Sequence, residues 1–224
     1  MRRFSGILVG ISALFVACGG GDPEKQVVDA FFSAVKDGDP AGVERVSLIP
    51  FEAQAETWEI VERGPESDAP FQLADLEAQL RSKRNEVDAQ RSDISAFIGD
   101  NRETYEAYTR QYAEDPSKPF TGEIAAFNEQ LRAMQTRVGE LEAEAEQLGY
   151  DVEALRNAAS RSLSTPVDAS FEGTVKVKPL QVKVNDGSSD KTYTVVLQRY
   201  DLVDTKQGRS LTPRWLVAEI QPQG

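Results

Sequence analysis

The chain has 224 residues and is acidic, with 37 aspartate and glutamate residues against 25 lysine and arginine residues and a net charge of −12. An acidic surface repels the phosphates of nucleic acids, so nucleic acid is not an expected partner. The chain has no histidine and one cysteine, which excludes Ser–His–Asp and Cys–His catalysis and histidine zinc ligands. No P-loop or GxGxxG motif follows a predicted strand, so the sequence predicts no catalytic residue, cofactor or metal.

The first 17 residues have the organisation of a secretory signal peptide. Arg2 and Arg3 precede the uncharged segment FSGILVGISALFVA, which is shorter than the roughly 20 apolar residues of a membrane span. The junction FVAC resembles the lipobox of bacterial lipoproteins, which implies cleavage before Cys18 and lipid attachment to its sulfur. An ordinary secreted protein with an incidental cysteine is the alternative. We expect residues 1–17 to be removed and residues 18–22 to form a lipidated tether.

The lipid on Cys18 defines the expected location, which is the membrane of the bacterial cell envelope. Cleavage removes Arg2 and Arg3, which leaves a net charge of −14 and no free thiol for catalysis. Gly19, directly after the cysteine, resembles the outer-membrane sorting signal of lipoproteins. In a Gram-negative bacterium, this resemblance implies an outer-membrane protein that faces the periplasm.

Residues 23–50 predict two short amphipathic helices. Val27, Phe31 and Val35 recur at helical spacing and predict the buried face of the first helix. Gly38 stands where the C-terminal cap of that helix is expected. The Asp39–Pro40 pair is typical of the N-cap and first residue of a second helix.

Residues 72–160 predict an antiparallel, α-helical coiled-coil hairpin. Apolar residues from Ile124 to Leu155 are spaced alternately by three and four, which is an a/d heptad seam of ten positions. A rougher heptad stretch precedes it, and a turn with two prolines separates the two arms. We expect two continuous arms, each about 55–60 Å long. Folding about Ser117 places Asn101 opposite Met134 as a polar mismatch within the first arm.

Residues 166–221 change to a period of two, which predicts three or four antiparallel strands. Apolar residues occupy odd positions up to Val177 and even positions from Leu180, which predicts a bulge or kink at Pro179. The segment NDGSSD (185–190) predicts a turn, although Asp186 and Asp190 could also suggest calcium ligands. Helices, a long helical insert and this sheet together predict an α+β fold.

Two segments resemble the lipoprotein branch of the NTF2-like superfamily: VVDAFFSAVKDGDPAGV (27–43), and YTVVLQRYD with RWLVAEI near the end. The resemblance implies helices packed on a curved antiparallel sheet, in a domain split into residues 23–71 and 161–224 by the hairpin. The segment 51–67 could not be aligned with this pattern. NTF2-like domains often have a pocket between helices and sheet; the aromatic residues that could line it here are Phe31, Tyr193, Tyr200 and Trp215. The alternative is that these four residues belong to the core.

The sequence leaves three functions open. The first is a non-enzymatic scaffold or protein-interaction module, acting through the hairpin on a protein partner or a second copy. Phe120 at the hairpin tip is its candidate contact, unless it packs locally beside the N-cap Thr121. The second is a small-ligand-binding protein, and the third is a periplasmic adaptor that resembles membrane-fusion proteins. An NTF2-like enzyme with a buried carboxylate would have to use Asp168 or Glu172, and we expect none.

Overall fold

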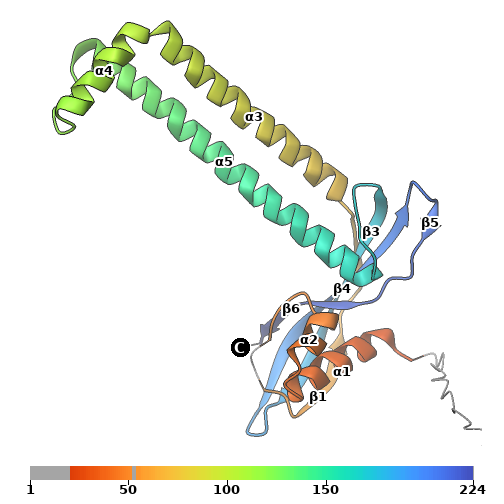
Figure 1. Ribbon diagram of the computed structural model, residues 1–224. Coiled ribbons are helices and arrows are strands. Elements are labelled where there is room, and N and C mark those ends of the chain that lie inside the picture. Colours follow the sequence, from red (N-terminus) through yellow and green to blue (C-terminus); the bar gives the residue numbers. More distant parts are fainter. Residues whose placement is uncertain (1–20, 52–53, 224) are drawn as a thin grey trace, which may run out of the picture.

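The computed structural model describes residues 21–51 and 54–223 and shows an α+β protein with a curled antiparallel sheet and two long helices (Figure 1). The elements in chain order are α1 (Pro23–Lys36), α2 (Pro40–Val46), β1 (Thr57–Arg63), β2 (Ser67–Pro70), α3 (Leu73–Asp100), α4 (Arg102–Glu114), α5 (Gly122–Leu163), β3 (Phe171–Asn185), β4 (Asp190–Asp204), β5 (Arg209–Ser210) and β6 (Leu216–Pro222). We call α3, α4 and α5 the arm, and the remaining elements the body.

The two predicted N-terminal helices are confirmed. The Asp22 carboxylate caps α1 by accepting hydrogen bonds from the backbone N–H groups of Glu24 and Lys25. After α1 ends, Gly38 adopts φ +63°, a left-handed conformation that glycine reaches without strain. Asp39 and Pro40 then begin α2 as predicted, although the Asp39 side chain makes no capping hydrogen bond.

The sheet is built on the hairpin of β3 and β4, which pair antiparallel over their full length from Phe171–Asp204 to Asn185–Asp190. The turn between them is the one predicted at residues 185–190. β1 and β2 pair one after the other along the outer edge of β3. In the same way, β6 and β5 pair along the outer edge of β4. The strands β1 and β2 lie within residues 51–71, where no strand was predicted.

Of the predicted bulge or kink at Pro179, the bulge is absent from the β3–β4 ladder, because β3 pairs with β4 through Pro179 without a register shift. The change of apolar parity has another cause. Leu180 and Val182 face one core, whereas Phe171 and Val175 face a second core on the other side of the same ribbon. Pro179 lies where the pairing of β3 passes from β1 to β2, so its missing N–H group costs no ladder hydrogen bond.

The two cores give the molecule its layers. In the first core, α1 packs on one face of the sheet, and Phe31 and Phe32 are completely buried there. In the second core, the base of α3 and the end of α5 pack on the opposite face around Tyr200 and Leu202. Residues of both cores fall between Val27 and Ile220, so a chain that begins at Gly21 keeps all of them.

The end of α5 is fixed to the body through Ser162, which is 1% exposed. Its hydroxyl donates to the carbonyl oxygen of Arg214 at 2.7 Å and accepts from the backbone N–H of Tyr200 at 3.3 Å. β6 pairs with β4 up to Gln198 and β5 pairs with it from Val203, so Tyr200 lies at a gap in the edge. Ser162 therefore satisfies a strand N–H group that no neighbouring strand reaches.

The arm consists of two antiparallel helical stretches, as Figure 1 shows. α5 is a single helix of 42 residues, about 63 Å long at 1.5 Å per residue. Three residues of α3 that follow the predicted seven-residue step, Leu73, Leu80 and Val87, are buried. The two helices are also linked by ion pairs, which include Lys83–Glu144 at 2.8 Å and Arg156–Glu77 at 2.7 Å.

The expectation of a continuous first arm is wrong, because the helix breaks at Asn101 between α3 and α4. Asn101 has φ −111° and ψ 33°, and its side-chain amide donates to the carbonyl oxygen of Phe97 at 2.9 Å. An asparagine side chain competes in this way with the helical backbone. Gly99 and Asp100 precede it, and all three residue types are poor helix formers. The break turns α4 away from the line of α3 (Figure 1).

Candidate functional site

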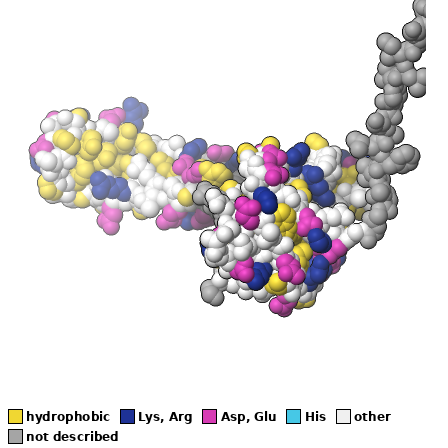
Figure 2. Space-filling view, turned by 90° about the horizontal axis from the view of Figure 1, so that it is seen from below, with side chains coloured by type: hydrophobic (Ala, Val, Ile, Leu, Met, Phe, Trp, Pro, Cys, Tyr) yellow, Lys and Arg dark blue, Asp and Glu magenta, His cyan; other side chains and the backbone are white. Residues whose placement is uncertain are grey.

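The far end of the arm carries a cluster of aromatic rings, which we call the tip cluster. Its members are Phe97, Tyr105, Tyr108, Tyr112, Phe120 and Phe127. Figure 2 shows hydrophobic side chains gathered over this end of the arm, far from the body. The cluster is the largest set of aromatic contacts in the described part of the arm, and we take it as the candidate functional site.

The sequence places the tyrosines on one face of α4 and turns that face toward α5. Tyr105, Tyr108 and Tyr112 are spaced by three and four residues, so they share a helix face. Their ring centroids are separated by 6.4 Å and 6.2 Å along the helix, in stacked arrangements. The ring centroid of Tyr108 also lies 5.9 Å from that of Phe127 of α5.

The predicted tip residue Phe120 belongs to this cluster. Its ring centroid lies 5.0 Å from that of Tyr108, and the side chain is half-buried. Thr121 occupies the N-cap position of α5 but makes no side-chain capping hydrogen bond. Phe120 therefore packs across the turn onto α4, and whether it also contacts a partner stays a prediction.

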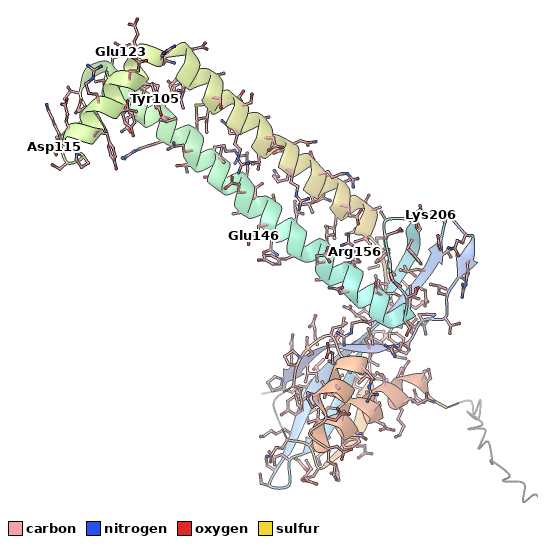
Figure 3. The ribbon with its side chains drawn as sticks, in the orientation of Figure 1. Tyr105, Asp115, Glu123, Glu146, Arg156 and Lys206 are labelled. Carbon is pink, nitrogen blue, oxygen red and sulfur yellow. The ribbon has the colours of Figure 1, made fainter. Side chains whose placement is uncertain are left out.

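The turn at the end of the arm is held by polar contacts. Asp115 accepts hydrogen bonds from the hydroxyl of Ser117 at 2.6 Å and from its backbone N–H at 3.0 Å. These bonds, the hydroxyl first, hold the pKa of the Asp115 carboxyl below its usual value. On the other side of the tip, the Thr104 hydroxyl donates to Glu123 at 3.1 Å. In Figure 3, Tyr105, Asp115 and Glu123 all lie at this end of the arm.

Exposure distinguishes the tip cluster from an internal core. Every residue of α4 is described, and none of them is buried. Tyr112 is 53% exposed, and within the cluster only Phe127 is buried. The tip thus presents aromatic side chains that are only partly covered by the chain itself. Tyrosine in this state is enriched at protein–protein interfaces, where a ring offers apolar contact and a polar hydroxyl.

The four aromatic residues predicted to line a body pocket are all buried, and one of them lies apart from the other three. Phe31, Tyr193 and Trp215 belong to the first core, whereas Tyr200 belongs to the second core across the sheet. Burial raises the pKa of Tyr200 to about 12, since a buried phenolate loses its hydration. Of the four, Trp215 lines one of the cavities described, next to α1.

The candidate carboxylates are in exposed turns and on an exposed strand position. Asp168 accepts hydrogen bonds from the hydroxyl and backbone N–H of Ser170 and from Lys206, and these bonds hold its pKa far below the usual value. A general base at neutral pH requires a pKa shifted in the opposite direction. Glu172 is exposed on β3, opposite Val203 of β4.

The turn at residues 185–190 uses its acidic side chains for its own hydrogen bonds. The Asp186 carboxylate accepts from the hydroxyl of Ser188 and from Lys191, and its pKa is far below the usual value for that reason. Asp190 accepts from Asn185 at 2.7 Å. Over residues 21–51 and 54–223, no three histidine, cysteine or acidic side chains are arranged to hold a metal ion.

The proposed lipid anchor Cys18 lies outside the described residues, as do residues 1–17. In the part of the chain that the structure describes, no helix is long and apolar enough to cross a membrane. Comparison of the chain with protein families, curated proteins and solved structures finds no match. The function of the chain is therefore inferred from its geometry.

Proposed function

We propose that this chain is a non-enzymatic lipoprotein of the bacterial cell envelope that acts as a protein-interaction module through the tip of its arm. Lipid on Cys18 anchors the chain, the body stands at the membrane, and the arm carries the tip cluster away from it. In fold terms, the body is an NTF2-like domain, and the arm is a coiled-coil hairpin inserted between β2 and β3. The order of the elements along the chain supports this division.

The observation that carries the proposal is α4, a helix of 13 residues without a buried side chain. Isolated helices shorter than about 12–15 residues are marginal in water, and packing of an apolar face normally stabilises them. The tyrosine face of α4 is covered only in part, by Phe127 and Phe120. A protein surface that closes over Tyr112 and its neighbours would supply the missing burial.

The length of the arm supports a bridging role. α5 runs without a break from Gly122 at the tip to the junction at Ser162, about 60 Å at 1.5 Å per residue. Ion pairs along the arm, such as Arg91–Glu142 at 2.7 Å, link α3 to α5. An anchored chain of this shape can reach a partner well above the membrane surface.

The test uses the full chain in cell membranes, with a photo-reactive benzoylphenylalanine at Tyr112. The matched control carries the same group at Tyr150, a tyrosine that is 63% exposed on α5 and lies outside the tip cluster. Tyr150 donates to Glu146, which Figure 3 places well along α5 from the tip. We expect an adduct of defined mass from position 112 and none from position 150.

The mass of the adduct identifies the partner as a second copy or as another protein. Light scattering of residues 21–224 with Tyr112→Ala then distinguishes the two, because a self-association through the tip is weakened and one elsewhere is unchanged. Equal adducts at positions 112 and 150, or none at position 112, would overturn the proposal.

A further inference from the structure

A cavity of about 410 Å³ lies in the body between α1, the end of α2 and the chain that leads into β6. The residues that line it are Pro23, Gln26, Val27, Ala30, Val46, Arg199, Pro213, Arg214 and Trp215. This volume falls within the range of small-molecule sites. The cavity is at the opposite end of the molecule from the tip cluster, so it is independent of the function proposed above.

The charge of this cavity is opposite to that of the chain. Two arginines line it and no carboxylate does, whereas each of the other four cavities described includes at least one aspartate or glutamate. In a chain with a net charge of −12, a lining whose only charged side chains are positive is a local exception. Such a lining favours an anion over a cation.

The two arginines differ in how far neighbouring groups compensate the charge of the guanidinium. Arg199 makes two hydrogen bonds to Asp201, at 2.9 and 3.0 Å, and its guanidinium lies 4.8 Å from the centre of the Trp215 ring. Its charge is therefore compensated and its position is fixed. Arg214 donates through Nε to the carbonyl oxygen of Arg161 at 3.0 Å and forms no ion pair among the described residues. The terminal nitrogens of Arg214 thus carry the uncompensated charge.

The remaining wall of the cavity is apolar. Val27 and Trp215 are buried core residues that show one side to it, and Ala30 and Val46 stand beside them. A ligand that matches this lining has an anionic head and a short apolar body. We propose that the cavity binds a small amphipathic anion, an organic carboxylate or phosphate ester, with Arg214 at its head and Val27, Ala30 and Trp215 around its apolar part.

The test measures binding of octanoate to residues 21–224, a chain that keeps both cores, by calorimetry and by tryptophan fluorescence. Trp58→Phe leaves Trp215 as the single tryptophan of the protein and makes the emission a direct reporter of the cavity. We expect a saturable change with octanoate. Octylammonium has the same number of carbon atoms and the opposite charge, and we expect no saturable change with it.

Two variants test the two halves of the site. Arg214→Gln removes the charge and is expected to weaken octanoate binding roughly tenfold or more, the loss typical of a charge-assisted hydrogen bond, while Arg214→Lys retains part of the affinity. Ala30→Leu fills the cavity from an exposed position of α1 with a good helix former, and is expected to abolish binding without loss of stability. Arg110→Gln on the arm is the matched control, with the same change of charge.

Three results would overturn the proposal. They are the absence of a saturable response to octanoate below its micelle concentration, an equal response to octylammonium, and equal affinities of the Arg214→Gln and Arg110→Gln proteins. Far-ultraviolet circular dichroism of each variant shows that the fold is kept. A loss of octanoate binding leaves the cross-linking at position 112 unchanged, so the two proposals are tested independently.

Discussion

Replacement of Ser162 by alanine tests the junction between the arm and the body. The hydroxyl makes two hydrogen bonds in a site that is 1% exposed, one of 2.7 Å to the carbonyl of Arg214 and one of 3.3 Å from the N–H of Tyr200. Alanine leaves both backbone groups without this partner. A buried polar group without its hydrogen bond costs about 1–3 kcal/mol, and the longer bond belongs at the lower end.

The expected net loss follows from these terms. Two unsatisfied groups cost about 3–4 kcal/mol together, and the better helix propensity of alanine at this position of α5 returns about 0.5 kcal/mol. We therefore expect Ser162→Ala to lower the free energy of unfolding by about 3 kcal/mol. With a urea m-value of about 2–3 kcal/mol/M, the midpoint falls by roughly 1 M.

The assay is urea unfolding of residues 21–224, followed by tryptophan fluorescence, because Trp58 and Trp215 both belong to the body core. Ser95→Ala is the matched control, since Ser95 is an exposed serine of α3 whose hydroxyl donates to the carbonyl of Arg91 in its own helix. Its midpoint should be unchanged or slightly higher. A Ser162→Ala midpoint equal to that of Ser95→Ala would refute the role assigned to Ser162.

Three further changes have defined outcomes. Gly173→Ala places a Cβ 2.1 Å from the carbonyl oxygen of Asp201 at φ +148°, and thermal unfolding should show a loss of at least about 2 kcal/mol. Burial raises the pKa of Tyr200 to about 12, against about 10 in the unfolded chain. The contribution of the Tyr200 phenol to stability is therefore complete below pH 10 and is lost as the pH rises toward 12. Phenolate absorbance should show that one tyrosine of the six ionises last. Asn101→Ala should join α3 to α4 and lengthen the distance between spin labels at positions 81 and 110, and an unchanged distance would contradict the role of Asn101.

The elements that local periodicity determines were predictable from the sequence. The helices around Gly38 and the residues Leu73, Leu80 and Val87 of α3 follow from spacing alone, because one helix face repeats every three to four residues. The break at Asn101 was missed, although Gly99 and Asp100 signal it. A polar residue at a seam position has two explanations, a mismatch facing a partner or a break, and the heptad pattern alone does not distinguish them.

The sheet illustrates the same limit. The apolar positions change from odd to even after Val177, but a bulge and a switch of the buried face produce the same pattern. The choice between them depends on what covers each face, and α5 covers the second face from a distant part of the chain. Strand β1 had a signal in the alternation of Trp58 and Ile60, whereas the presence of Arg199 and Arg214 in the lining of one cavity has no local signal.

Arg214 belongs to both the junction and the cavity. Its backbone carbonyl accepts from Ser162, and its side chain lines the cavity beside Trp215. Arg214→Gln keeps the backbone contact and removes the charge, whereas Ser162→Ala removes the backbone contact and keeps the charge. We expect the first variant to lose octanoate binding and to keep the urea midpoint near that of the parent. The second loses stability and, at low urea, still binds octanoate.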